Sequence, residues 1–159
     1  MKTLKLSTVI YLFILFLTTN SSFSQRIINT TEVTPSFLKE TFENAYIEVQ
    51  EVKDTYLKVK DVFTIYVDLD PNKRYITLSS VYNLTEGTSK KDALELVNKI
   101  NTEVALIKMY YSESTNSISY YYYFWTEGGF TQKSLIGALR LYKSALSLTL
   151  EKDTAKLIK

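Results

Sequence analysis

Apolar and polar residues alternate along four segments in the middle of the chain, and this alternation predicts β-strands. Successive side chains of a strand point to opposite faces, so a period of two marks a segment with one buried face. The segments are residues 46–52, 56–59, 62–69 and 75–82, and they are rich in β-branched and aromatic side chains. Because the connections between them are short, we expect an antiparallel meander.

Apolar residues spaced three and four apart predict three helices around these strands. The first, residues 34–44, opens on Thr-Pro, a pair that suits the cap and first turn of a helix. The second extends from a Thr-Ser cap at 88–89 to about residue 103. The third runs from Thr131 to about Glu151, after two glycines that break the chain.

Two more strand-like segments, residues 106–112 and 118–125, form a predicted hairpin between the second and third helices. The expected order is therefore helix, four-stranded antiparallel meander, helix, β-hairpin and long C-terminal helix. This order is typical of an α+β domain with its helices packed on one sheet face. We assign this single domain to residues 34–152, with a flexible leader at 25–33 and a frayed tail at 153–159.

The N-terminal residues have the pattern of a secretory signal peptide. Lys2 and Lys5 precede an uncharged apolar run at 9–17, and a small-x-small site, Ser-Phe-Ser, follows at 22–24. Nine apolar residues are too few to cross a hydrocarbon layer of ~30 Å. We therefore expect cleavage of a signal peptide at residues 1–24, no stable membrane span afterwards, and export to the periplasm or the extracellular space.

The composition removes several classes of chemistry. The chain contains no cysteine and no histidine, which excludes disulfides, Cys/His zinc sites, thiol nucleophiles and any general base that uses imidazole. Without the signal peptide, basic and acidic residues are equal in number, so charge gives no attraction to nucleic acid.

Three local patterns resemble functional motifs and have simpler interpretations. Residues 68–72 begin like a calcium loop, but the Gly and Glu of the EF-hand pattern are missing, which favours a hairpin turn. Residues 127–131 precede a helix as a phosphate loop does, but two glycines there permit a bend of the chain. Carboxylate pairs such as Asp92 and Glu95 are typical of a solvated face. We therefore expect no catalytic residue, no metal site, no cofactor and no enzymatic activity.

Tyrosine is the unusual feature of this chain, which has 13 of them. Residues 120–125 read Tyr-Tyr-Tyr-Tyr-Phe-Trp, and the neighbouring strands alternate so that one sheet face is aliphatic and the other rich in Tyr, Thr, Ser and Lys. Helices on the aliphatic face would leave the second face aromatic and exposed to water. Its candidate binding residues are Tyr66, Tyr110, Tyr121, Tyr123 and Trp125.

Three interpretations of these rings stay open at this point: cross-strand packing within the sheet, self-association, and binding of a foreign ligand. Tyr and Trp are enriched in recognition surfaces because they offer a large contact area at a low entropy cost. An extended polypeptide on this face would also take main-chain hydrogen bonds from the sheet edge. A small ligand, such as a sugar or another planar group, would instead stack on the same rings in an enclosed pocket.

Four segments of the chain resemble the YbjN family: TPSFLKETFENAYIEV (34–49), RYITLSSVYNL (74–84), DALELVNKINTE (92–103) and GGFTQKSLIGALRLYKSAL (128–146). The resemblance implies a fold similar to type III secretion chaperones, small α+β proteins that commonly dimerise and hold partner polypeptides. Members are described as bacterial sensory transduction regulators, and the family has no agreed catalytic residues. Many relatives carry glycine at the end of the first helix, where this chain has Asn44-Ala45, and Asn supports a left-handed turn there.

Together these observations predict an exported, non-enzymatic YbjN-like protein of a Gram-negative bacterium. It would act through protein contact, as a homodimer, as a chaperone-like binder of a polypeptide, or as both. The alternative is a small-ligand binding protein that uses the same aromatic sheet face. We expect no nucleic acid partner.

Overall fold

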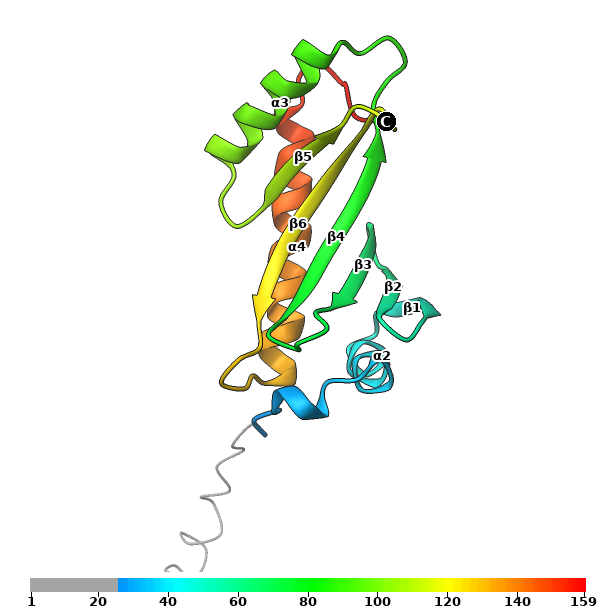
Figure 1. Cartoon of the computed structure of the whole chain (residues 1–159), viewed down its shortest axis with the longest axis vertical. Coiled ribbons are helices and arrows are strands. Elements are labelled where there is room, and N and C mark those ends of the chain that lie inside the picture. The colour runs from blue at the N-terminus through cyan, green and yellow to red at the C-terminus, as the bar shows by residue number, and fades with distance from the viewer. Residues whose placement is uncertain (1–25) are drawn as a thin grey trace, which may run out of the picture.

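The computed structural model describes residues 26–159 and shows six antiparallel strands backed by helices (Figure 1). The helices are a short 3₁₀ turn η1 (Thr30–Glu32), α2 (Pro35–Asn44), α3 (Lys90–Glu103) and α4 (Gln132–Lys152). The strands are β1 (Glu48–Val52), β2 (Tyr56–Lys60), β3 (Thr64–Leu69), β4 (Tyr75–Asn83), β5 (Lys108–Ser112) and β6 (Ser117–Trp125). The α+β class and the element order predicted from the sequence are thus confirmed, whereas the expected signal peptide lies outside the described residues.

The sheet has the strand order β1-β2-β3-β4-β6-β5, and every neighbouring pair is antiparallel. The first four strands form the expected meander. The β5–β6 hairpin then joins it through β6, which pairs with β4 along nine residue pairs, from Tyr75–Trp125 to Asn83–Ser117. This long central pairing makes β4 and β6 the spine of the molecule.

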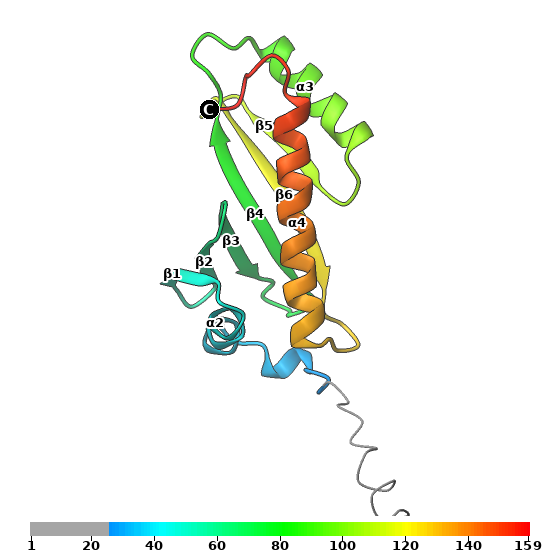
Figure 2. The same ribbon diagram turned by 180° about the vertical axis from the view of Figure 1, so that it is seen from behind.

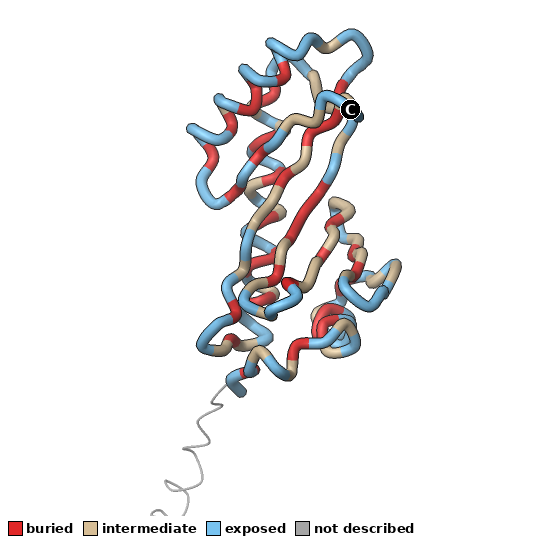
Figure 3. The backbone as a smooth tube through the Cα atoms, in the orientation of Figure 1, coloured by how far each residue is buried: buried red, intermediate tan, exposed pale blue. Residues whose placement is uncertain are grey.

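All three α-helices lie on one side of the sheet, and α4 runs along the back of β4 and β6 (Figure 2). α2 packs on β1 and β2, and α3 packs beside β5. The core between the layers is apolar because alternate strand residues face the helices, an alternation that is visible along the strands in Figure 3. Its most buried strand residues are Leu57, Val59, Ile65, Val67, Ile76, Leu78, Met109, Ile118 and Tyr120.

The helices begin at the caps that the sequence predicts. The hydroxyls of Thr34, Ser89 and Thr131 each accept a hydrogen bond from the backbone N–H three residues later, at 3.1 Å. These bonds satisfy amides that a helix start otherwise leaves unpaired. Thr88, the other candidate for the second cap, instead donates a hydrogen bond from its hydroxyl to the carbonyl of Thr85.

The end of α2 differs from the expectation that Asn44 takes a left-handed turn. Tyr46 is the left-handed residue, with φ of +60°. Its N–H donates to the carbonyl of Glu43, and the N–H of Ile47 donates to the carbonyl of Phe42, which together make a Schellman motif. Phe42 and Ile47, the two residues at the ends of this motif, are both buried in the core.

Both segments outside the predicted domain are held by the fold. Ile28, in the expected flexible leader, is buried and exchanges two backbone hydrogen bonds with Phe130. In the expected frayed tail, Ile158 pairs with Leu84, and the N–H of Lys159 donates to the carbonyl of Asn83. These bridges are too short to leave a periodic pattern in the sequence, so only tertiary contacts reveal them.

Candidate functional site

The side of the sheet away from the helices carries a cluster of aromatic rings, which we call the tyrosine face. It consists of Tyr66, Tyr75, Tyr110, Tyr121, Tyr123 and Trp125. Strand register puts them on one side, because the residues that alternate with them along each strand face the helices. Tyr122, for example, lies between Tyr121 and Tyr123 and contacts Tyr142 of α4. All five predicted residues belong to this face. Tyr75 was missed, although its parity relative to the apolar residues Ile76 and Leu78 could have indicated it.

Five of these rings form one continuous row. Tyr110 meets Tyr121 edge to face, with ring centroids 5.5 Å apart, and Tyr121 stacks on Tyr123 at 6.5 Å. Tyr75 then contacts Tyr123 at 5.5 Å and stacks on Trp125 at 6.4 Å. Aromatic pairs contribute about 0.5–1.5 kcal/mol each, and all of these except Tyr121–Tyr123 join two strands, so the rings help to hold the sheet together.

The row is also open to solvent. Tyr110, Tyr123 and Trp125 are 51%, 50% and 57% exposed, and no helix of the described part of the chain covers them. Burial and the neighbouring phenols raise the pKa of Tyr123, so its hydroxyl stays protonated at neutral pH. Tyr123 therefore presents a large, uncharged ring to solvent, and its hydroxyl can donate a hydrogen bond.

Tyr66 stands apart from the row. It lies on β3, where its ring centroid is 6.1 Å from that of Tyr56, and the Lys58 ammonium lies 6.0 Å from the Tyr66 ring centroid. One strand, β4, separates it from Tyr121, because Ser79 of β4 pairs with both residues. The structure thus brings four of the five predicted residues together and puts Tyr66 on the opposite side of a depression.

This depression is an open groove along β4, which we call the β4 groove. Tyr66 lines one side, and Tyr121 and Tyr123 line the other. The floor consists of short or acidic side chains, namely Asp68, Thr77 and Ser79, and Tyr75 and Val81 lie at its ends. The groove exists because β4 carries the short side chains of Thr77 and Ser79 between Tyr75 and Val81, while the flanking strands β3 and β6 carry tyrosines.

Asp68 is the carboxylate in the floor of the β4 groove. It is half-buried, and burial raises the pKa of its carboxyl group. The Ser79 hydroxyl donates a long hydrogen bond to it, at 3.5 Å, and lowers the pKa only partly. Within residues 26–159, no lysine or arginine forms an ion pair with Asp68.

Both edges of the sheet have features that oppose the addition of another strand, contrary to the expectation that an edge supplies hydrogen bonds to a ligand. The β1 edge has a bulge between Val49 and Glu51. At the β5 edge, the carboxamide of Asn101 accepts from the Met109 N–H at 2.8 Å and donates to the Met109 carbonyl at 3.0 Å. Asn101 therefore occupies the place of a neighbouring strand.

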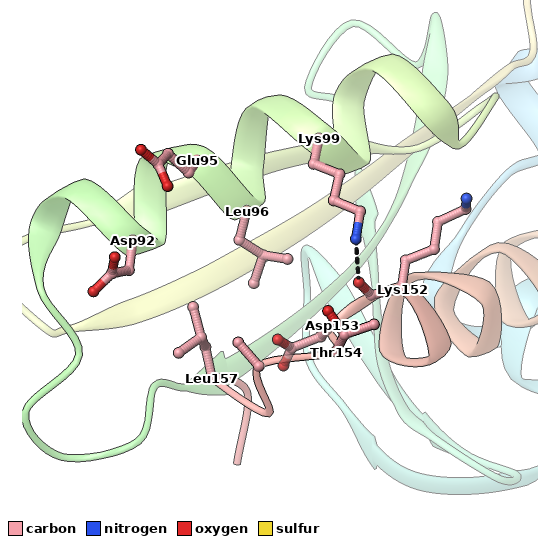
Figure 4. Close-up of a pocket in the computed structure, with 9 residues that line it drawn as sticks. Asp92, Glu95, Leu96, Lys99, Lys152, Asp153, Thr154 and Leu157 are labelled. Atoms are coloured by element: carbon pink, nitrogen blue, oxygen red, sulfur yellow. Dashed lines mark hydrogen bonds between the residues drawn. The ribbon is translucent and has the colours of Figure 1, made fainter.

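A second pocket lies where α3 meets the C-terminal segment (Figure 4). Lys99 donates to the carbonyl of Lys152 at 2.9 Å, and Asp153 Oδ2 accepts from the N–H of Ile158 at 2.8 Å. Asp92, which lines this pocket, accepts a hydrogen bond from the Ser89 hydroxyl, and Glu95 forms an ion pair with Lys91 of the same helix. These contacts stabilise helix ends and the C-terminal segment. The acidic residues of this pocket therefore have structural roles.

The two loops with motif-like sequences make ordinary turns. The Asp70 carboxylate accepts from the N–H of Arg74 at 3.1 Å, and so closes the β3–β4 turn. Gly128 and Gly129 have φ near +90°, the left-handed region that lets the chain bend from β6 to the cap of α4. Among residues 26–159 no three acidic side chains gather as metal ligands, and no helix has the length and apolar character to cross a bilayer.

The fold defines the class of protein first. It matches the crystal structure of YbjN, "a putative transcription regulator from E. coli", with a TM-score of 0.66 and 15% sequence identity, over 78% of this chain and 94% of that one. At this identity the match shows a shared α+β architecture. No curated protein matches the chain.

Sequence similarity then assigns the family. The YbjN model, described as "Putative bacterial sensory transduction regulator", matches residues 61–151, which is more than half of the chain. The chain belongs to the YbjN family, as the resemblance of its segments predicts. The description is that of a regulator and not of an enzyme. The matched region begins just before β3 and ends within α4, so it contains the whole row of rings and the β4 groove.

Proposed function

We propose that this protein is a non-enzymatic regulator that works by protein contact through its tyrosine face. A second copy of the chain or another polypeptide would lie against the row of rings. The single observation that carries the proposal is a continuous row of five aromatic rings on a sheet face without helices, with three members at least half exposed. Exposed aromatic patches of this kind mark interaction surfaces in proteins.

The shape of the face favours a protein partner over a small ligand. A small-ligand site is concave and buries most of its ligand. The β4 groove is open to solvent along its length, and the row of rings beside it is exposed. Since both sheet edges are protected, the contact would be made mainly by side chains and less by added main-chain hydrogen bonds.

Export belongs to the same proposal and is supported by the sequence alone. The charged start, apolar run and small-x-small site at residues 1–24 favour release into the periplasm or beyond. In that compartment the regulatory contact would be with an exported polypeptide or with another copy of this protein. Cell fractionation, followed by N-terminal sequencing of the mature form, tests this part: a cytoplasmic protein that retains Met1 would contradict it.

Replacement of Tyr121 and Trp125 by serine tests the contact. We expect the double variant to associate at least about tenfold more weakly, because Tyr and Trp anchors dominate binding energies. The variant loses three ring pairs, namely Tyr110–Tyr121, Tyr121–Tyr123 and Tyr75–Trp125, which should lower the free energy of unfolding by about 1.5–4.5 kcal/mol. Light scattering of the mature form measures self-association, and a pull-down from the same compartment measures binding of other polypeptides.

Tyr46→Ser provides a matched control, because Tyr46 is 99% exposed and lies at the end of α2, outside the sheet. It should leave association unchanged. Unchanged association in the double variant would contradict the proposal. So would unfolding of the variant that accounts for the whole loss of association, because the rings would then have only a structural role.

A further inference from the structure

The β4 groove combines two chemical features that the row of rings does not have. Tyr66, Tyr121 and Tyr123 line it from the two strands that flank β4, and the carboxylate residue Asp68 lines it between them. A carboxylate between aromatic rings is a combination that selects positive charge, since both the ring faces and the carboxylate attract cations.

We propose that the β4 groove receives a lysine or arginine side chain of the partner polypeptide, with the cationic group at Asp68 and the alkyl chain between Tyr66 and Tyr123. This inference rests on the proposed function and adds the chemistry of the partner. It makes the tyrosine face selective for a basic position in an extended segment.

The charge of Asp68 is the first argument. Its only hydrogen bond within the described part of the chain is the long one from Ser79, and no cation pairs with it there. A half-buried carboxylate in this condition has lost part of its hydration, and the Ser79 hydrogen bond replaces only part of that loss. The raised pKa of its carboxyl group has the same cause. A cation brought by a partner would supply the missing contact.

The rings supply the second argument. Lys58 already holds its ammonium 6.0 Å from the Tyr66 ring centroid, which shows that this ring accepts a cation within the chain itself. Lys58 on β2 and Lys108 on β5 are the register partners of Tyr66 and Tyr121. These two lysines repel a second positive charge at the margins, so the partner's cation is favoured at Asp68 and disfavoured to either side.

The length of the groove favours a polypeptide over a free amine. From Tyr75 to Val81 the groove follows six steps of β4, or about 20 Å at the strand rise of about 3.4 Å. An isolated ammonium occupies a small part of this length. The short side chains of Thr77 and Ser79 leave space along the remainder, which an extended segment of about six residues would fill.

Peptide titration of the full chain tests the inference. The probe is an end-blocked peptide, Ser-Val-Thr-Lys-Thr-Val-Ser, compared with a twin that carries neutral norleucine in place of lysine. Trp125 is the single tryptophan of the chain and stacks on Tyr75 at the end of the groove, so its fluorescence reports binding. We expect the lysine peptide to bind about tenfold or more tightly than its twin.

Variants of Asp68 complete the experiment. Asp68→Asn should remove the preference for lysine, and Asp68→Glu should restore most of it, with thermal unfolding recorded for each. Glu95→Gln removes one negative charge from the exposed side of α3 and should leave the preference intact.

Equal binding of the two peptides would overturn the selection of charge while leaving the contact through the rings, which the Tyr121 and Trp125 variants measure separately. Failure of both peptides to bind would overturn this inference. If n-butylammonium binds as tightly as the lysine peptide, the site serves a free amine and the polypeptide occupant is wrong.

Discussion

Tyr46 illustrates how a single residue holds a backbone conformation that its side chain does not favour. Its φ of +60° closes the Schellman motif at the end of α2, and its side chain is 99% exposed. A non-glycine residue at positive φ carries a steric penalty from its Cβ atom. The motif offsets this penalty, because it joins Phe42 and Ile47 by a backbone hydrogen bond and both side chains are buried in the core.

Tyr46→Gly should therefore stabilise the protein. The change removes the Cβ penalty and deletes a side chain that is exposed almost completely, so we expect the free energy of unfolding to rise by about 0.5–1 kcal/mol. Urea denaturation measures it. Tyr46→Ala is the matched control, since alanine keeps the Cβ and should gain little. A glycine variant no more stable than the alanine variant would show that the turn is unstrained.

At the scale of elements, Asn101 of α3 protects the outer edge of β5 by its two hydrogen bonds to the Met109 backbone. Asn101→Leu should leave the N–H and carbonyl of Met109 without partners, which lowers the free energy of unfolding by about 1–3 kcal/mol. It should also expose an edge that pairs with other chains, so that the variant aggregates as protein concentration rises. Thermal unfolding and light scattering follow the two effects.

Asn98→Leu, on the same helix, is the appropriate comparison, because the Asn98 side chain is exposed and makes no hydrogen bond within the described residues. It should cost little stability and leave the protein dispersed. Identical behaviour of the two variants would mean that Asn101 does not protect the edge.

Most elements could be predicted because each leaves a periodic signal of several residues. Alternation located β3, β4 and β6, and cap residues such as Thr131 located helix starts to within a residue. The parity argument also predicted which side of the sheet would be aromatic. Contacts that consist of one or two residues have no such signal, which is why the pairing of Ile28 with Phe130 and the role of Asn101 could not be predicted. The groove likewise depends on which strands become neighbours.

At the scale of the whole molecule, the sheet divides into two unequal parts. β3 pairs with β4 over only four residue pairs, from Tyr66–Ser79 to Leu69–Ile76, whereas β6 pairs with β4 over nine. The ladder between β3 and β4 ends at Tyr66–Ser79, beyond which the Ser80 hydroxyl donates to the Thr64 carbonyl and β3 diverges from β4 in Figure 1. The ion pair of Lys143 with Asp61 connects the turn before β3 to α4, and buried residues of β2 and β3 share one apolar core with α4.

Hydrogen exchange should report this division. We expect amides of β2 and β3 to exchange about tenfold or more faster than those of β4 and β6, because fewer pairings must open to free them. Lys143→Ala should increase the difference by acting on the first part alone. Uniform protection across the six strands would contradict the division and indicate that the sheet opens as one unit.

The attachment of the C-terminal segment to the end of β4 has a practical consequence for every binding assay. Lys159 donates its N–H to Asn83, so an affinity tag fused directly behind it would emerge against the sheet and strain that bridge. The first described segment, blue in Figure 1, lies at the opposite end of the long axis from the C-terminus. A cleavable handle placed ahead of Arg26 therefore leaves the docked end undisturbed and suits immobilisation on a sensor surface.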